Sequence, residues 1–401
     1  MKDWKNVILG DCIEIKNGQV DPRIIQYSEM ILIAPNHIES STGRITYKET
    51  SIEQNAISGK YLVNKGDVIY SKIRPYLMKV AIAEEGCLCS ADMYPINGKS
   101  TIINRYLFYL LLSDRFTQFA ISQSGRTGIP KINREELNEY IFPLPPLPEQ
   151  KKIAQILSIW DRAIELLEKK IAAKEKLKKG LMQKLLTGAL RLRSATGQPF
   201  GPPAKKGELP EGWKEVRLGD VFSERVETGY NNLPLLSVTS EQGIINRNEL
   251  DKKDTSNSDK SKYLRICPGD IGYNTMRMWQ GRSAVSTLEG IISPAYTVVI
   301  PKPEIDIKFA GYLFKFPMII HRFWRYSQGL VDDTLNCKFN SFSRVLVYLP
   351  SVNEQQKVGI ILEKIENNIK ILIKHKDKII EQKKGLMQLL IGKVRVKVKY
   401  S

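Results

Sequence analysis

Apolar residues recur at alternating steps of four and three positions along residues 149–193, and again along residues 351–401. A period of 3.5 residues is typical of a helix that buries one narrow stripe against another helix, as in a coiled coil. Each predicted helix has about 40 residues, or roughly 60 Å at 1.5 Å per residue. The predicted seam consists of Ile153, Leu157, Trp160, Ile164, Leu167, Ile171 and Leu181 in the first helix, and Val358, Leu362, Ile365, Ile369, Leu372, Ile379 and Leu386 in the second.

Lysines interrupt this seam. Lys174 and Lys178 fall on the lattice of the first helix, and Lys376 and Lys383 on that of the second. A lysine at a seam position lowers stability, but it can fix the register or face a further partner. The alternative is that each helix packs only on its own globular domain, although one such domain cannot easily cover a stripe of this length.

The rest of the chain predicts two mixed α/β heads, residues 1–148 and 213–350. Short apolar runs at 61–63, 68–70, 79–83, 296–300 and 345–348 indicate strands, and residues 105–113 and 308–326 indicate helices. Residues 194–212, which are rich in proline and glycine, predict an extended linker with a reach of up to roughly 60 Å. A linker of that reach allows the helices to pair antiparallel, with an approximate two-fold axis between the halves; reach alone does not exclude a parallel pair.

The chain is an internal repeat. Residues 149–183 align with residues 354–388 without a gap, and 14 of these 35 positions are identical. The preceding segments agree only at scattered points, so two similar helices carry two divergent heads. The matches lie at offsets between 203 and 209: residues 4–11 with 213–220, 66–70 with 269–273, 106–108 with 312–314, 149–150 with 354–355, and 178–183 with 383–388.

The formal charge of +18 makes nucleic acid the first candidate partner. Residues 149–193 and 354–401 each hold 12 basic and 5 acidic residues, so most of the excess charge lies on the two helices. No P-loop, GxGxxG, GxSxG, HExxH or zinc-ligand spacing is present, which predicts a chain that is not an enzyme and holds no metal. With no long apolar run and no leader-like start, we expect the protein in the cytoplasm.

A turn between two predicted strands of the first head combines cations, phenols and a proline. Residues 70–76 read Tyr-Ser-Lys-Ile-Arg-Pro-Tyr. An arginine can donate two hydrogen bonds to guanine O6 and N7, or bind a phosphate. A second loop, at 124–131, contains two glycines that allow close backbone approach to a phosphate. The candidate DNA contacts of this head are Ser71, Lys72, Arg74, Tyr76, Arg126, Thr127 and Lys131.

The equivalent turn of the second head, residues 273–282, reads Tyr-Asn-Thr-Met-Arg-Met-Trp-Gln-Gly-Arg. Asparagine or glutamine can read adenine, and arginine can read guanine. Two other interpretations stay open: the apolar residues Met276, Met278 and Trp279 as simple core, and the arginines as members of surface salt bridges. The candidate DNA contacts of this head are Asn274, Arg277, Trp279, Gln280 and Arg282.

Two motifs that each occur twice give the chain a family resemblance. A proline-rich segment leads into Glu-Gln at 142–150, with fewer prolines at 349–355, and the helices carry Lys-Gly-Leu-Met-Gln at 179–183 and 384–388. This pattern closely resembles the specificity (S) subunits of type I restriction-modification systems, over essentially the whole chain. Residues 273–281 also resemble one subtype of target-recognition domain in that family.

The resemblance implies a non-catalytic subunit with two target-recognition domains separated by an antiparallel coiled coil. Each head is then expected to read one half of a bipartite, asymmetric DNA sequence. The helices are expected to set the gap and to dock two methyltransferase (M) subunits, which bind S-adenosylmethionine. Restriction (R) motor-nuclease subunits, with ATP and Mg²⁺, complete the complex that the resemblance implies. The rival hypotheses are a coiled-coil scaffold whose heads bind proteins, and a stand-alone nuclease or methyltransferase.

Overall fold

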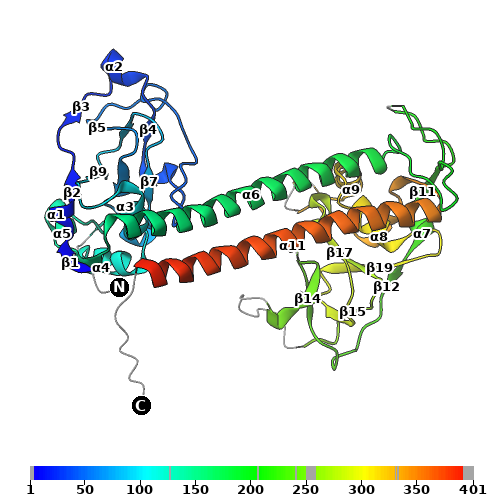
Figure 1. Cartoon of the computed structure of the whole chain (residues 1–401). Helices are drawn as coiled ribbons and strands as arrows, with labels where there is room; N and C mark the ends of the chain where they lie inside the picture. Colours follow the sequence, from blue (N-terminus) through cyan, green and yellow to red (C-terminus); the bar gives the residue numbers. More distant parts are fainter. Residues whose placement is uncertain are drawn as a thin grey trace. The chain divides into compact units, whose positions relative to one another are not determined.

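The chain forms two compact units, seen in a computed structural model that describes residues 4–125, 128–205, 207–239, 242–249, 259–329, 331 and 334–391 (Figure 1). The first unit comprises Met1–Glu168 and Lys374–Ser401, and the second comprises Lys169–Ile373. Each unit therefore contains one head, part of helix α6 (Leu147–Leu185) and part of helix α11 (Val352–Ile391). The predicted fold class, mixed α/β heads on two long helices, is confirmed.

The first head is built around two four-stranded sheets, ordered β2-β9-β6-β7 and β3-β5-β8-β4, and a β1-β10 ribbon. All four residues of β6 are buried, which suits a strand paired on both edges. The strands are β1 Lys5–Ile8, β2 Ile13–Ile15, β3 Gln19–Val20, β4 Leu32–Ile33, β5 Lys60–Val63, β6 Val68–Ser71, β7 Val80–Ile82, β8 Cys87–Cys89, β9 Met93–Gly98 and β10 Ile141–Leu144. The helices are α1 Leu9–Cys12, α2 Ile25–Ser28, η1 Pro35–His37, η2 Pro75–Leu77, α3 Asn104–Leu111, α4 Asp114–Gln123 and α5 Arg134–Asn138.

The second head repeats the main sheet in the order β12-β19-β16-β17 and the ribbon as β11-β20. Its second layer differs, because two separate ribbons, β13-β14 and β15-β18, replace the other four-stranded sheet. The strands are β11 Lys214–Arg217, β12 Phe222–Arg225, β13 Leu236–Val238, β14 Ile244–Asn246, β15 Leu264–Ile266, β16 Ile271–Asn274, β17 Ser283–Val285, β18 Gly290–Ile292, β19 Tyr296–Pro301 and β20 Leu346–Leu349. The helices are α7 Leu218–Val221, η3 Arg247–Glu249, η4 Met278–Gln280, α8 Ile307–Leu313, α9 Pro317–Tyr326 and α10 Phe339–Ser343.

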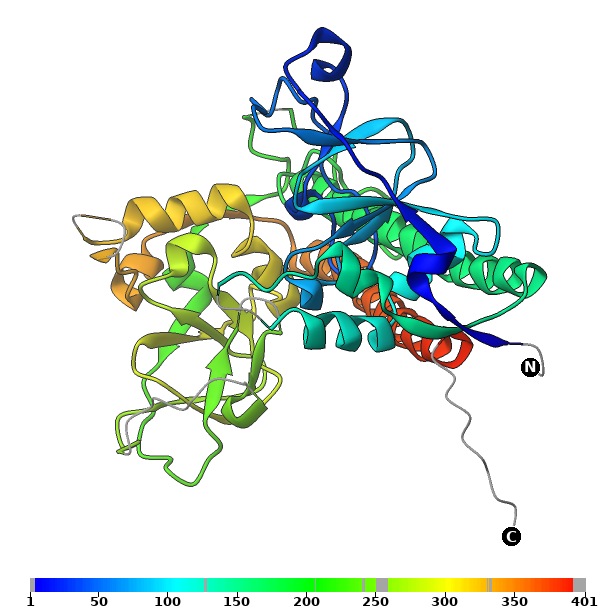
Figure 2. The same cartoon turned by 90° about the vertical axis from the view of Figure 1, so that its left-hand side faces the viewer.

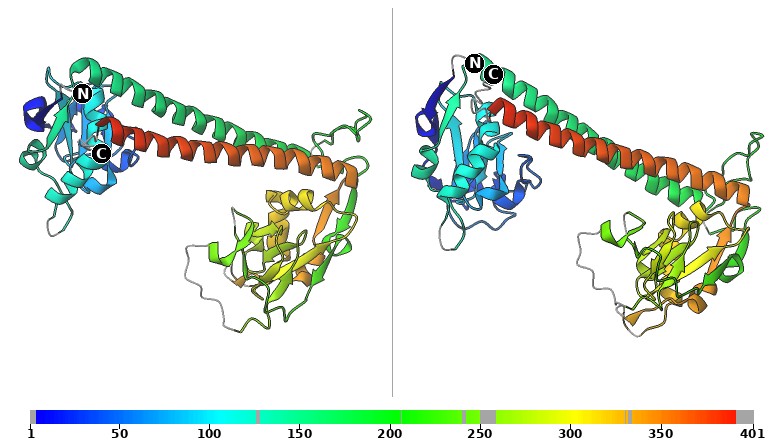
Figure 3. Two further views of the ribbon diagram at one scale, coloured as in Figure 1. Left: turned by 60° about the horizontal axis from the view of Figure 1, so that its bottom comes forward. Right: turned by 90° about the horizontal axis from the view of Figure 1, so that it is seen from below.

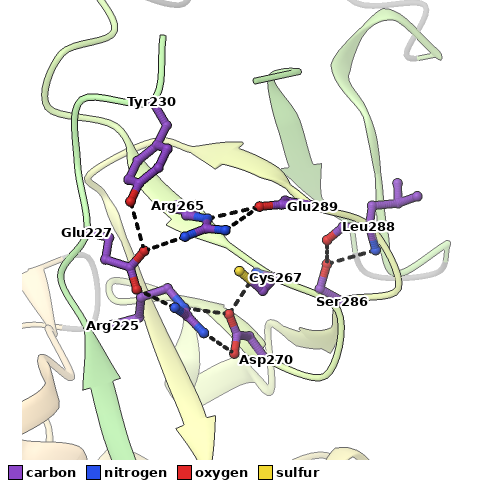
Figure 4. Close-up of polar contacts among 9 residues, drawn as sticks. All are labelled: Arg225, Glu227, Tyr230, Arg265, Cys267, Asp270, Ser286, Leu288 and Glu289. Carbon is purple, nitrogen blue, oxygen red and sulfur yellow. Dashed lines mark hydrogen bonds and ion pairs between the residues drawn. The ribbon is translucent and has the colours of Figure 1, made fainter. Parts of the chain in front are cut away.

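The repeated Gly-Asp motif has the same structural role in both heads. Asp67 Oδ2 and Asp270 Oδ2 each accept the backbone N–H of a residue in the preceding turn, at 2.7 Å. Each carboxylate also forms an ion pair. Asp67 pairs with Lys16, which directly follows β2, and Asp270 pairs with Arg225, the last residue of β12. In the second head this pair extends into a network through Glu227 to Arg265 and Glu289, which connects β12 to β15 (Figure 4).

The repeated Glu-Gln motif fixes the start of each long helix against its head. Gln150 Oε1 accepts the backbone N–H of Ile103 at 3.0 Å, and Gln355 Oε1 accepts that of Asp306 at 2.8 Å. Each Nε2 donates to the carbonyl of a proline just before the helix, at 2.8 Å and 2.9 Å. Both glutamines are fully buried, so these hydrogen bonds satisfy groups that water cannot reach.

The helices pair antiparallel, as the core of each head demonstrates. Ile153 and Leu157, near the start of α6, share the first core with Met387 and Ile391 from the end of α11. Conversely, Val358 and Leu362, near the start of α11, share the second core with Leu185 and Leu186. A parallel pair would place the two helix starts together. The helices lie side by side within each unit in the views of Figure 3, and all predicted seam residues are buried or half-buried.

Two of the seam lysines form the same cluster in each unit. In the first unit Lys383 pairs with Asp161, and its ammonium lies 5.6 Å from the Tyr109 ring centre. Tyr109 Oη donates to Asp161 Oδ2 at 2.6 Å. In the second unit Lys178 pairs with Glu366 at 2.8 Å and lies 5.6 Å from the Tyr312 ring centre. Tyr312 Oη donates to Glu366 Oε2 at 3.0 Å.

These clusters have two consequences. Each joins α6, α11 and a head, an arrangement that suits fixing the register of the helix pair, one of the two roles left open for a seam lysine. They also correct the repeat alignment, because Tyr312 occupies the structural place of Tyr109, not of Tyr106 as the match of residues 106–108 implied.

Acid is expected to weaken the second unit through Glu366. Burial raises the pKa of this carboxyl, but the hydrogen bond and charge of Lys178 and the hydrogen bond of Tyr312 lower it by more, to about 2. The unfolded carboxylate has a pKa near 4.3, so its contribution to stability is complete above that pH and is lost as pH falls towards 2. Urea unfolding at a series of pH values should show a shallower acid slope for Glu366→Gln than for the wild type. Identical slopes would contradict this assignment.

Two predicted boundaries need correction. The segment 308–326 is two helices, α8 and α9, because Pro317 cannot continue the first helix and instead starts the second. Helix α6 ends at Leu185 and not near residue 193, since Gly188 adopts φ 71° and Leu190 N–H bonds back to the Lys184 carbonyl. None of the helices among the described residues is sufficiently long and apolar to span a bilayer.

Candidate nucleic-acid interface

The candidate loop of the first head connects β6 to β7. Arg74 adopts a left-handed conformation at φ 49° and caps η2, whose first residue, Pro75, is buried. The Arg74 backbone N–H donates to the Pro130 carbonyl at 2.8 Å, and Ile73 forms an antiparallel bridge with Lys131. The structure therefore brings the two predicted loops of this head together, with Arg74 and Lys131 both exposed.

Tyr76 adds an exposed phenol to this surface, because its side chain is 54% accessible. Lys72 is half-buried, and its ammonium lies 5.3 Å from the Tyr94 ring centre. Burial first, and then the charge of Lys131, lower the pKa of Lys72. Ser71 is the exception: it is buried and its hydroxyl donates to the Ile73 carbonyl at 3.0 Å, so it does not reach the surface. Arg126 and Thr127 lie outside the described residues.

The candidate loop of the second head connects β16 to β17 and is closed by its own side chains. The Asn274 backbone N–H donates to the Arg282 carbonyl at 3.0 Å, and Asn274 Oδ1 accepts the Met276 N–H, also at 3.0 Å. Trp279 Nε1 donates to the Met276 carbonyl at 3.0 Å. Gly281 ends η4 at φ 74°, a conformation that side chains disfavour. The side-chain amide oxygen of Asn274, Oδ1, therefore stabilises the loop conformation.

The core alternative holds for one of the three apolar residues of this loop. Met278 is fully buried, Trp279 is half-buried, and Met276 is 45% exposed. Gln280 and Arg282 are exposed, so both are available to a ligand. The buried Met278 anchors the loop to the core, while Gln280 and Arg282 remain on its surface.

Arg74 and Arg277 occupy equivalent places, since each is the residue before the short helix η2 or η4. Both are exposed, and among the described residues neither side chain has a hydrogen bond or an ion pair; the same is true of Arg282. The alternative interpretation, that these arginines form surface salt bridges, therefore does not hold among the described residues. An unpaired guanidinium on a fixed loop suits bidentate binding to a base or a phosphate.

Sequence reasoning missed Arg134, which supports the loop of the first head. Its guanidinium donates to the carbonyls of Ile15 and Lys16 at 3.0 Å and 2.8 Å. It also lies 5.0 Å from the Tyr94 ring centre and 5.7 Å from that of Tyr61. No local motif marks this residue, because its partners are distant in sequence. The described residues contain no cluster of His, Cys, Asp and Glu suited to a metal ion.

Two similar heads, each with an exposed cationic loop and each with a core that includes residues of both long helices, define a protein that presents two related recognition surfaces. The family model for the type I restriction modification DNA specificity domain matches residues 1–176 and 210–382. The chain therefore belongs to this family, and the two matched ranges correspond to its two halves.

The chain is also similar to individual proteins of this kind. It is 40% identical over 170 residues to the EcoDI specificity subunit of Escherichia coli, a match that covers 41% of this chain and only 38% of that subunit. It is 28% identical over 425 residues to the MjaVIII specificity subunit of Methanocaldococcus jannaschii, covering 99% and 94% of the two chains.

Solved structures show the same fold. The S subunit of a type I restriction-modification system from M. genitalium superposes with a TM-score of 0.60 at 14% identity, over 98% of this chain and 97% of that one. A chain from work on complex assembly and conformational transition of the type I R-M system superposes with a TM-score of 0.58 at 18% identity, over 98% of each chain.

Proposed function

We propose that this chain is the DNA-sequence-recognition subunit of a type I restriction-modification complex. The observation that carries the proposal is the pair of equivalent exposed arginines, Arg74 and Arg277, each unpaired among the described residues and each held on a fixed loop. The loops around them differ in sequence, so the two heads are expected to read different half-sites of a bipartite, asymmetric target. Family membership supports this function over a protein-binding scaffold.

The chemistry is proposed to reside in partner subunits. Two methyltransferase subunits would bind S-adenosylmethionine and methylate adenine, and motor-nuclease subunits would use ATP and Mg²⁺. This chain would be non-catalytic: it would hold the DNA in register and dock the methyltransferases. The excess positive charge of the segments that contain α6 and α11 supports binding to DNA flanks or to acidic partner surfaces.

The first experiment is to map the methylated sites in DNA treated with this chain and its methyltransferase subunits. Arg74→Ala and Arg277→Ala should then each weaken binding to that target by about 1–3 kcal/mol, roughly 5- to 150-fold, because each removes a bidentate contact. If the lost contact is with a base, each change should relax discrimination at bases of one half-site only. If the lost contact is with a phosphate, each change should weaken binding to target and shuffled duplexes alike. Arg23→Ala, which removes an arginine already paired with Asp21 in the first head, is the matched control.

Unchanged binding and methylation by both loop variants would contradict the choice of reading loops. Equal binding of the wild-type complex to target and shuffled duplexes would contradict the proposed function itself, and would favour the protein-binding scaffold.

A further inference from the structure

Helix α9 of the second head carries an exposed aromatic pair, His321 and Trp324, outside the loops proposed to read DNA. The His321 and Trp324 rings stack with centres 5.5 Å apart and an angle of 16° between their planes. Trp324 is 45% exposed, although full burial of such a large ring is normally favourable.

The helix is fixed beside the candidate reading loop at two points. Near its middle, Ile320 packs against Gly281, where a Cβ atom would lie 2.9 Å from Ile320 Cδ1. Just beyond its end, Gln328 forms an antiparallel bridge with Asn336, and the backbone N–H of the next residue, Cys337, donates to the Thr275 carbonyl at 2.8 Å.

Helical geometry then places Trp324 on the loop side of α9. Residues four apart lie one above the other on a helix face, so Trp324 follows Ile320 along the flank that faces η4. The opposite flank is occupied, because Arg322 donates to the Leu346 carbonyl and lies 5.1 Å from the Tyr348 ring centre. Figure 2 shows α9 in gold within the second head.

Charge favours DNA as the ligand of this face. Helix α9 contains Arg322 and Arg325 but no aspartate or glutamate, and of these two cations Arg325 is the one that is not engaged on the opposite flank. Arg325 is exposed and forms no ion pair within the described parts of the chain. Cations beside an exposed aromatic ring are the combination that binds nucleic acid, through phosphates and stacking respectively.

The first head lacks this pair at the same place. Helix α4 packs beside η2 as α9 packs beside η4, and the two helices have the same length. At the positions that correspond to His321 and Trp324, α4 has Gln118 and Ile121. The difference therefore separates the two heads at a site next to their reading loops, where different half-sites require different contacts.

We propose that Trp324, supported by His321, is a specificity-determining contact to the half-site read by the second head, an inference that rests on the proposed function. The indole contacts the duplex as an apolar wedge at a base step next to the bases read by the loop. Such a wedge favours base steps that unstack easily, and so it reads sequence through deformability. Arg325, the next residue along α9, binds a phosphate near this base step.

The test uses the complex of this chain with its methyltransferase subunits and two duplexes: the mapped target, and the same target with the half-site of the second head scrambled. Trp324→Ala should bind the target roughly tenfold more weakly, the low end for a stacked aromatic ring, and should bind the scrambled duplex as the wild type does. Trp324→Phe should retain most of the affinity. Ile121→Ala, the corresponding change on α4, should leave discrimination at this half-site intact.

The Arg325→Gln variant provides a second, independent measurement, because it leaves the His321–Trp324 pair unchanged. It should weaken binding to both duplexes and reduce the salt slope by about one, as loss of a phosphate contact does. The inference is overturned if Trp324→Ala keeps wild-type affinity, if it loses affinity equally on both duplexes, or if size-exclusion chromatography shows that it prevents assembly, which would assign the face to a protein. Failure of the proposed function is distinct, because the wild type itself would then not discriminate between the duplexes.

Discussion

Inserting one base pair into the gap between the two half-sites should weaken binding of the assembled complex by about 30-fold or more. Specific binding to DNA exceeds non-specific binding by about 10³–10⁷-fold, and losing one of two half-sites removes roughly half of that advantage on a logarithmic scale. One base pair turns one half-site by about 34–36° relative to the other. Helices α6 and α11 each continue from one unit into the other without a break, and a continuous helix does not stretch to compensate.

The measurement is a titration of the complex with duplexes whose gaps are shortened or lengthened in single steps. The control is the same base pair inserted outside the target, which should leave the affinity unchanged. Tolerance of insertions within the gap would show that the helices do not act as a ruler, even if each head reads DNA.

The Arg191→Met substitution should destabilise the second unit by about 3–5 kcal/mol, the range for removing one partner of a buried ion pair. Arg191 Nε and Nη2 bond the two Glu354 carboxylate oxygens at 2.8 Å and 2.9 Å, and both side chains are only 3% exposed. Arg191 also donates to the carbonyls of Glu211 and Phe200, at 2.9 Å and 3.1 Å. Its guanidinium therefore joins the segment after α6 to the start of α11.

The loss arises because the substitution leaves the Glu354 carboxylate buried without a counter-charge. Arg193→Met is the matched control, since Arg193 is exposed and its guanidinium bonds the Gly197 carbonyl. The double variant Arg191→Met/Glu354→Met should recover part of the stability in urea unfolding, because an apolar pair replaces the buried charges. An Arg191→Met variant as stable as the control would show that the ion pair contributes little.

Local patterns in the sequence predicted the features that neighbouring residues determine. Period 3.5 predicted both long helices and their seam, and the repeats predicted two heads of one design. The same repeats placed Arg74 and Arg277 at equivalent positions, which the structure confirms at the N-terminal ends of η2 and η4. Whether these arginines bind DNA stays a prediction.

Features that depend on distant partners were not predictable in this way. The ion pair of Arg191 with Glu354 and the contacts of Arg134 with two tyrosines join residues that are far apart in the chain. The sequence left core as an open interpretation for Met276, Met278 and Trp279, and only the structure shows that Met278 alone is buried. The aromatic pair on α9 gave a local signal, a His, a Trp and arginines without any acid, but its place beside the reading loop did not follow from that signal.

The sequence by itself determined the duplicated helices, the two divergent heads and the family to which the chain belongs. The antiparallel pairing that the resemblance implied is confirmed. Only the tertiary structure decided that the end of each helix completes the core begun by the start of the other, and that Lys178 and Lys383 pair with carboxylates across the seam. The reason is that hydrophobic periodicity specifies which face of a helix is buried, whereas the partner of that face is selected by packing and charge between segments that are far apart in sequence.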